Sequence, residues 1–173
     1  HVPPWPIPKL FRLASKKKLI KGIFEGGTIN TPSMICVEDG LDALNWVDEI
    51  GGLEACIKRA NDSFDFINTW VSDSSSIDFL CQETINRSNT SVCLKFKDNR
   101  VINLDEDAQR NLAKEIGILL EREGVALDIV NHRSAPPGLR IWTGATVEPT
   151  DVSALLPWID WAYNHAFNEI IGK

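Results

Sequence analysis

Residues 131–144 read NHRSAPPGLRIWTG, a polar loop that runs directly into a short apolar segment. The sequence Pro136-Pro137-Gly138 has the composition of a tight turn, and residues 139–143 predict a strand. A strand of this kind has to pair with other strands and bury its apolar side chains. We therefore expect the elements on either side to form a scaffold that holds this loop and strand.

The segments after residue 72 have the patterns of a small sheet with helices. Residues 89–97 alternate in polarity, which places Val92, Leu94 and Phe96 on one face of a predicted strand. The other strands are predicted at 77–80 (a short strand or turn), 125–130 and 139–143. Together with two helices, these strands predict an α/β chain with a small, mainly antiparallel sheet covered by helices on one face.

Two helices are predicted in this second part of the chain. Asp105 is expected to cap a helix over 106–123, which Gly124 ends. Thr150 is expected to cap the last helix, which Pro157 should kink.

Two more helices are predicted before residue 72. Thr31 and Pro32 are the preferred residue types at the N-cap and first position of a helix, here expected over 31–50. Apolar residues recur at steps of three and four between 53 and 71, which predicts a second helix over 53–72. These helices need a surface to pack on, and the sequence does not obviously supply one.

Composition and charge exclude several classes of protein. The chain has 173 residues, of which 43% are hydrophobic and 24% charged, as in an ordinary globular protein. Its net charge of -6 argues against nucleic-acid binding, and no apolar run reaches the ~20 residues of a membrane helix. The four cysteines, at positions 36, 56, 81 and 93, lack the spacing of a zinc or redox site. We expect free thiols, no metal site and a cytoplasmic location.

The loop at 131–144 carries three cationic candidates, His132, Arg133 and Arg140. Arginine binds carboxylate and phosphate groups through two parallel N–H bonds. If the Pro-Pro-Gly turn folds the three residues together, they form an anion site. The alternative is that both arginines are surface residues paired with some of the 24 acidic side chains.

A second candidate is Asn30-Thr31 at the expected start of the first helix. Unpaired N–H groups at a helix N-terminus favour phosphate, and the Asn and Thr side chains add donors. The alternative is ordinary helix capping.

Four segments of the chain, taken together, resemble the C-terminal part of the phosphoserine aminotransferase family. They are PPWPIPKLFRL at 3–13, IFEGGTINTPSMICVEDGLDAL at 23–44, RSNTSVCLKF at 87–96 and HRSAPPGLRIWTGATVE at 132–148. The resemblance implies a fold-type I enzyme that uses pyridoxal 5'-phosphate. It also implies a homodimer that transfers an amino group from glutamate to 3-phosphohydroxypyruvate, giving phosphoserine and 2-oxoglutarate in serine biosynthesis.

The resemblance also implies roles for individual residues. Asn30 and Thr31 would contact the cofactor phosphate, His132 and Arg133 the substrate phosphate, and Arg140 the substrate α-carboxylate. In some members of the family the two arginines are six apart across a Gly-Gly turn, whereas here they are seven apart across Pro-Pro-Gly.

The catalytic lysine of the family has no counterpart in this sequence, because no lysine lies in the matching context. The resemblance therefore implies that residues 1–50 are the tail of the large cofactor-binding domain. Residues 51–173 would be a connecting helix and the small C-terminal domain, inactive without the upstream large domain. Two alternatives stay open, namely a related class V aminotransferase with another substrate and a non-catalytic module that binds anions or partners.

Overall fold

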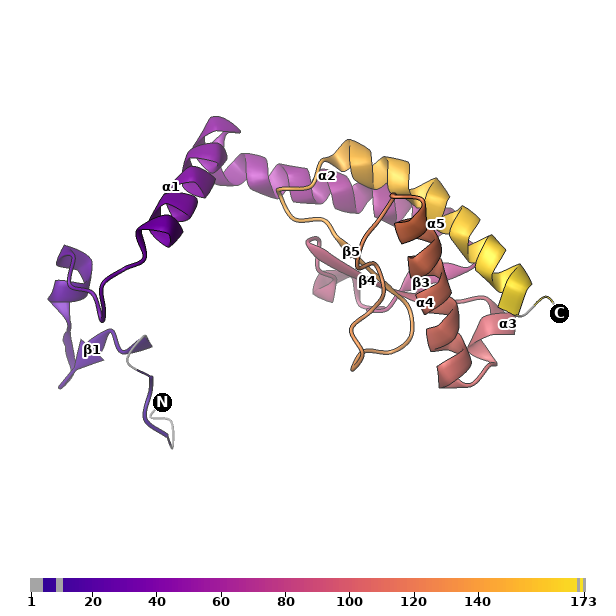
Figure 1. The fold of residues 1–173 in the computed structure, drawn as a ribbon, viewed down its shortest axis with the longest axis horizontal. Helices are drawn as coiled ribbons and strands as arrows, with labels where there is room; N and C mark the ends of the chain where they lie inside the picture. Colours follow the sequence, from indigo (N-terminus) through magenta and orange to yellow (C-terminus); the bar gives the residue numbers. More distant parts are fainter. Residues whose placement is uncertain (1–4, 9–10, 171, 173) are drawn as a thin grey trace. The chain divides into compact units, whose positions relative to one another are not determined.

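The chain divides into two compact units, His1–Glu49 and Ile50–Lys173. The computed structural model describes residues 5–8, 11–170 and 172, so that Pro3, Pro4, Lys9 and Leu10 of the first resembling segment lie outside the described residues. Figure 1 shows the order of the elements along the chain. Among the described residues, no helix is long and apolar enough to cross a membrane.

The second unit is built on a three-stranded antiparallel sheet in the order β3-β4-β5. Its strands are β3 (Ile77–Phe79), β4 (Ser91–Phe96) and β5 (Leu139–Trp142). Burial alternates along each strand, so that the predicted face of Val92, Leu94 and Phe96 is buried. On the opposite face the register places Cys93 of β4 beside Arg140 of β5.

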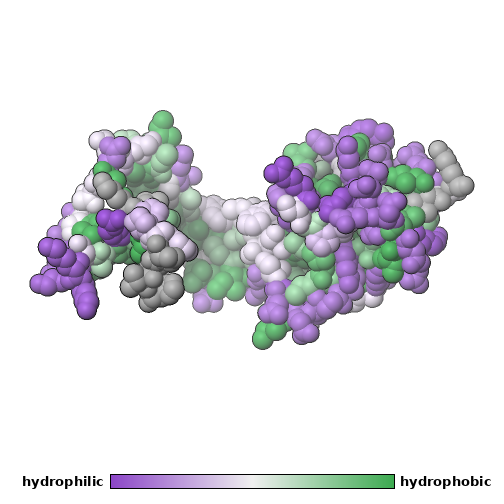
Figure 2. Space-filling view, turned by 90° about the horizontal axis from the view of Figure 1, so that it is seen from below, coloured by the Kyte–Doolittle hydropathy of each residue, from purple (hydrophilic) through white to green (hydrophobic). Residues whose placement is uncertain are grey.

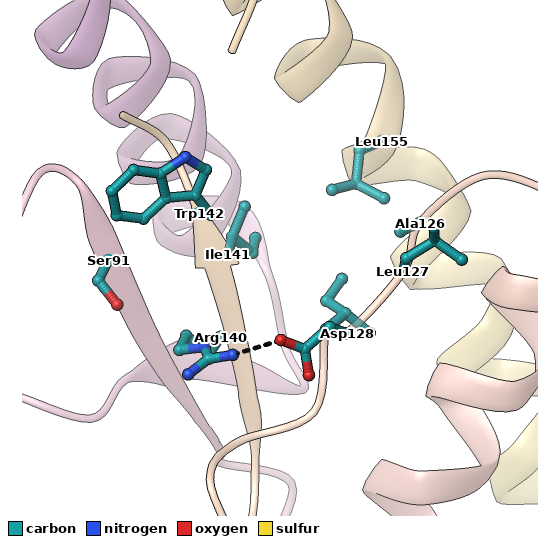
Figure 3. Close-up of a pocket in the computed structure, with 9 residues that line it drawn as sticks. Ser91, Ala126, Leu127, Asp128, Arg140, Ile141, Trp142 and Leu155 are labelled. Atoms are coloured by element: carbon teal, nitrogen blue, oxygen red, sulfur yellow. Dashed lines mark hydrogen bonds and ion pairs between the residues drawn. The ribbon is translucent and has the colours of Figure 1, made fainter. Parts of the chain in front are cut away.

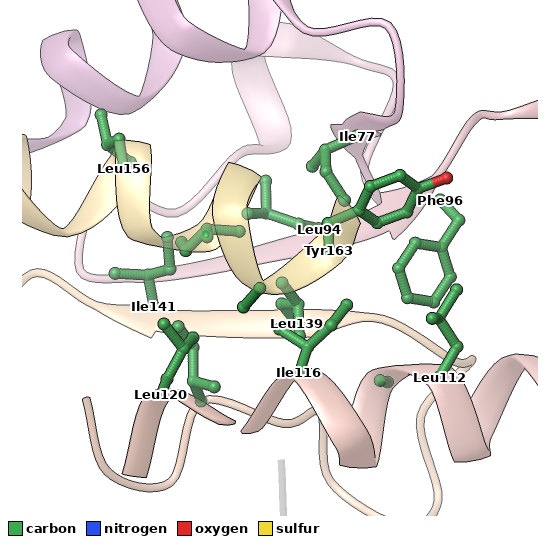
Figure 4. Packing of buried hydrophobic residues seen from close by; sticks show 14 of the residues in the cluster. Ile77, Leu94, Phe96, Leu112, Ile116, Leu120, Leu139, Ile141, Leu156 and Tyr163 are labelled. Carbon is green, nitrogen blue, oxygen red and sulfur yellow. The ribbon is translucent and has the colours of Figure 1, made fainter. Parts of the chain in front are cut away.

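Three long helices complete this unit, namely α2 (Gly52–Asp73), α4 (Glu106–Arg122) and α5 (Pro149–Ile170). Helix α5 packs against both α2 and α4, and Figure 1 shows α2 and α5 side by side. Apolar side chains from the three helices and the buried face of the sheet form one core (Figure 4). The predicted fold class, a small antiparallel sheet with helices, is thus confirmed.

Residues 125–130 do not form the predicted strand. The structure has only an isolated bridge there, between Val130 and Leu139. Asp128 has a positive φ of 50°, a left-handed conformation that interrupts an extended strand and that Asp tolerates better than most residues. The segment is therefore a loop that runs along β5.

Two α-helices begin elsewhere than predicted, and one short α-helix was not predicted. Helix α1 (Met34–Glu49) starts three residues after Thr31, because the first helical N–H, that of Val37, bonds to the carbonyl of Ser33. Helix α5 starts at Pro149 rather than after Thr150, because proline suits the first position of a helix. The short helix is α3 (Asn99–Ile102), where the sequence predicted only a turn.

Among the described residues of the first unit, 5–8 and 11–49, none is buried, so they form no core. It contains the two-stranded hairpin β1 (Ala14–Ser15) and β2 (Lys18–Leu19), the 3-10 helix η2 (Lys21–Glu25) and α1. None of the residues of α1 is buried, and its apolar side chains Ile35 and Leu44 are 74% and 62% exposed. Hydrophobic side chains accordingly lie on the surface of this unit (Figure 2). The expectation that both helices before residue 72 need a further surface agrees with this exposure for α1, but it is wrong for α2, which packs against α5 and contributes Ile67 and Val71 to the core.

Candidate anion-binding site

Arg140 lies on the outward face of the sheet, near the middle of β5. Its neighbours Leu139 and Ile141 are 0% and 4% exposed because they point into the core, and the strand alternation turns Arg140 the other way. The Arg140 side chain is 34% exposed. A rigid strand therefore presents a half-covered guanidinium group to solvent.

A cavity of about 540 Å³ opens beside this guanidinium group (Figure 3). That volume is within the usual range for sites that bind small molecules. Its lining combines the β5 face, Ser91 of β4, the loop 126–129 and Leu155 of α5. Trp142 provides an aromatic wall at the end of the strand. The cavity lies entirely within the second unit, and it can accept a small ligand that carries a carboxylate.

Arg140 forms an ion pair with Asp128, in which an Nη atom donates to a carboxylate oxygen at 2.7 Å (Figure 3). Within the described part of the chain this is the only hydrogen-bonding partner of the Arg140 side chain. Asp128 was not among the residues singled out from the sequence. It was placed in a predicted strand, and its separation of 12 positions from Arg140 gives no local signal of the pair.

His132 and Arg133 lie in the loop before β5, and both are exposed. The ring atom Nδ1 of His132 accepts a hydrogen bond from the backbone N–H of Ser134, at 3.2 Å. Arg133 lines a different cavity, of about 290 Å³, together with Arg110 and Lys114 of α4. The structure therefore places Arg133 and Arg140 at two cavities of the second unit and does not bring them together in one.

Two residues fix the Pro-Pro-Gly turn against β4. The Asn131 amide donates hydrogen bonds to the carbonyls of Leu94 and Pro136, at 3.3 and 3.2 Å. Gly138 has a φ of 151°, and a Cβ atom there would collide with the carbonyl oxygen of Leu94. Only glycine allows this approach without displacement of the backbone. The turn is thus held to the central strand at both ends.

Asn30 and Thr31 lie in the first unit, just before α1, and both are exposed. The Asn30 side-chain oxygen accepts a bond from the Thr31 N–H at 2.9 Å, which leaves the Asn30 amide N–H groups and the Thr31 hydroxyl available to a ligand. These are donors of the kind that bind phosphate oxygens. Asn30 and Thr31 belong to the first unit and Arg140 to the second.

No cluster of metal-ligating side chains occurs among the residues that the structure describes. No model of a protein family matches the chain.

Comparisons with known proteins give a consistent result. The chain is 46% identical over 164 residues to phosphoserine aminotransferase of Methanosarcina barkeri, and it is 45% identical to that of Methanosarcina mazei. Each alignment covers 95% of this chain but 42% of the relative, so the chain spans about two fifths of the relatives' length.

Among solved structures, phosphoserine aminotransferase from Bacillus circulans subsp. alkalophilus matches with a TM-score of 0.67 and 22% identity. That match covers 83% of this chain and 36% of the solved chain, and it establishes the fold alone. The resemblance predicted from the four sequence segments is confirmed: over nearly its whole length, the chain is similar to the C-terminal portion of the phosphoserine aminotransferases.

Proposed function

We propose that this chain supplies the substrate-carboxylate side of a phosphoserine aminotransferase. The reaction would move an amino group between glutamate and 3-phosphohydroxypyruvate. The identity of 46% over 164 residues supports this proposal, because relatives this similar commonly share their chemistry. The observation that carries the proposal is the half-covered Arg140 beside a cavity of ligand size.

Arg140 would bind the α-carboxylate of the substrate. Two parallel N–H bonds from a guanidinium group fix both the position and the plane of a carboxylate. The side chain is mounted on a strand whose neighbouring residues are buried in the core, so the bound carboxylate would be held in one place. Fixing this end orients the rest of the substrate toward the reacting atoms.

The cofactor would be pyridoxal 5'-phosphate, which supplies an electron sink for the amino transfer when it is bound. Asn30 and Thr31 provide donors that fit its phosphate group. We place the lysine that would hold the cofactor in the part of the relatives that this chain does not cover. The enzyme would be a cytoplasmic homodimer. Residues 1–50 would be the tail of its large domain, and residues 51–173 would be a connecting helix and the small domain.

His132 and Arg133 would bind the substrate phosphate. Because Arg133 and Arg140 line different cavities, this role requires the loop before β5 to bring Arg133 toward Arg140 when the substrate binds. Both side chains are exposed and available to a ligand, and Arg133 lines a cavity that also presents Arg110 and Lys114. Arg110 is already paired with Glu106, so selection for a phosphorylated substrate would rest on Arg133 and Lys114, whose charges an analogue without the phosphate leaves unpaired.

The test of the proposal is a chimeric enzyme in which this chain replaces the matching portion of the Methanosarcina barkeri relative. We expect the chimera to make phosphoserine from 3-phosphohydroxypyruvate and glutamate. Arg140→Gln should lower kcat/KM about 100-fold or more, since loss of a charged bidentate contact costs about 3 kcal/mol. Arg122→Gln is the matched control, because it removes an exposed arginine that does not line the cavity. A folded chimera that is inactive, or an Arg140→Gln variant as active as the control, would refute the assignment.

The same chimera tests the substrate class. Arg133→Ala should lower kcat/KM for 3-phosphohydroxypyruvate by at least tenfold more than for an unphosphorylated 2-oxo acid. Equal losses for the two substrates would favour the alternative, a related class V aminotransferase that acts on another amino acid.

A further inference from the structure

The ion pair of Arg140 with Asp128 places a carboxylate of the protein at the group proposed to bind the carboxylate of the substrate. We propose that Asp128 is an internal competitor, which occupies Arg140 in the ligand-free protein and is displaced by the ligand carboxylate. The inference rests on the proposed role of Arg140 and assigns a specificity-determining residue to the same site.

The backbone on either side of Asp128 is held against β5. The N–H of Arg140 donates to the carbonyl of Ile129 at 2.7 Å, and Val130 forms a bridge with Leu139. Ile129 is 4% exposed and belongs to the core. The left-handed backbone at Asp128 then turns its side chain out of the core and toward the guanidinium group (Figure 3). This position is fixed by the fold, so the pair does not depend on a freely moving loop.

The pair is nevertheless weak enough to be exchanged. The Asp128 side chain is 83% exposed and its hydrogen bond uses one Nη atom, so water screens the attraction. Exposed ion pairs contribute roughly 0.2–1 kcal/mol. A ligand carboxylate that enters the cavity can form two parallel bonds to Arg140 and bury part of its own surface, and Asp128 can return to solvent at little cost. Asp128 would therefore lower the affinity of every ligand that has to displace it from Arg140 by the same factor, so that only a ligand with further favourable contacts in the cavity binds well.

A purely orienting role for Asp128 predicts the opposite effect of mutation. If Asp128 held the guanidinium group in its binding geometry, removing the carboxylate would weaken ligand binding. If Asp128 competes, removing it strengthens binding. The sign of the change in affinity thus separates the two roles.

The experiment titrates the 15N-labelled 173-residue chain, at constant ionic strength, with O-phosphoserine and in parallel with glycerol 3-phosphate, which has a phosphate but no carboxylate. The readout is the side-chain Nε–H resonance of Arg140, assigned by its loss in Arg140→Lys. Asp128→Asn should tighten the apparent Kd for O-phosphoserine about two- to fivefold, the fold-change that corresponds to an exposed ion pair. Asp128→Asn should change the apparent Kd for glycerol 3-phosphate less. The control Asp65→Asn should change the apparent Kd of neither ligand. Asparagine also tolerates the left-handed backbone of position 128.

Three results would overturn the proposal. They are weaker or unchanged O-phosphoserine binding in Asp128→Asn, an equal gain for both ligands (a general charge effect), and no shift of the Arg140 resonance in any variant. The readout is binding at Arg140 and needs no catalysis, so an inactive chimera would refute the proposed function without deciding this inference. Conversely, an active chimera with unchanged Asp128→Asn binding would refute only the inference.

Discussion

Among the residues that the structure describes, Asp98 is the carboxylate that accepts the most hydrogen bonds. It accepts bonds from the backbone and side chain of Arg100 and, at 3.0 Å, from the hydroxyl of Tyr163 on α5. The hydrogen bonds from the Arg100 side chain are the main reason that the pKa of Asp98 is lowered from 3.8 to about 2. Burial raises the pKa of Tyr163 to about 12, so the hydroxyl stays a donor at neutral pH. Asp98 thus links the start of α3 to α5.

Because the folded-state pKa of Asp98 is lowered, the ionised side chain stabilises the protein above its unfolded value. That stabilisation is fully present above about pH 4 and is lost as the pH falls toward 2. Asp98→Asn should therefore lower the free energy of unfolding at pH 7 by roughly 1–2 kcal/mol, a figure reduced because Arg100 is largely exposed. The deficit relative to wild type should shrink at pH 2.5, as urea denaturation at both values would measure. A constant deficit across this range would contradict the assignment, and Asp65→Asn serves as the control.

At the scale of elements, the helix starts are the sharpest difference between the sequence and the structure. Asp105 caps α4 as predicted, with its carboxylate oxygen accepting the N–H of Ala108 at 2.8 Å. Thr150 lies inside α5, and the carbonyl of Glu148 accepts the first N–H groups of that helix. The two residues thus have the same predicted role but different observed ones.

We expect Asp105→Ala to lower the free energy of unfolding by about 1 kcal/mol, the usual cost of a lost N-cap. Thr150→Ala should change it by less than about 0.5 kcal/mol, because an exposed helical residue without a capping bond contributes little. Urea denaturation followed by circular dichroism measures both values. Similar losses in the two variants would mean that Thr150 caps α5 after all.

The sequence predicts a helix or strand well where the apolar residues repeat with one period and all lie on one buried face. Helix α2 and strand β4 were placed within a few residues because their apolar positions repeat over the whole element. The segment 125–130 is as apolar as a strand, but it pairs with β5 through a single bridge at Val130. Nothing in the neighbouring sequence reveals the left-handed backbone at Asp128.

The residues of the candidate site also differ in how well the sequence predicts them. Arg140 was found because its residue type and its place on a strand suffice to suggest anion binding. Asp128 was missed because its role depends on a contact between residues 12 apart that only the folded chain brings together. Whether His132 and Arg133 act with Arg140 stays a prediction.

At the scale of the whole chain, the two units differ in what they bury. All the described hydrophobic residues of the core lie at or after position 60, within the second unit. The first unit exposes large apolar side chains, among them Trp5 at 66%, Phe11 at 67% and Phe24 at 66%. The beginning of α2 is similar, since Leu53 and Ile57 are 70% and 45% exposed. Hydrophobic burial is the main favourable contribution to folding, so stability should reside in the second unit.

A fragment of residues 50–173 should therefore fold without the first unit. We expect one cooperative urea transition, with a free energy of unfolding within about 0.5 kcal/mol of the same transition in the 173-residue chain, because no core side chain has been removed. A peptide of residues 1–49 should show no cooperative transition, because it has too little buried apolar surface to offset the entropy of ordering its backbone. Amide hydrogen exchange should agree, with the slowest exchange in β4 and α4. A fragment of residues 74–173 is the matched control: it lacks Ile67 and Val71 of α2, which pack in the core beside α5, and it should not fold. Cooperative folding of 74–173, or failure of 50–173 to fold, would show that the core is not the source of stability that its burial indicates.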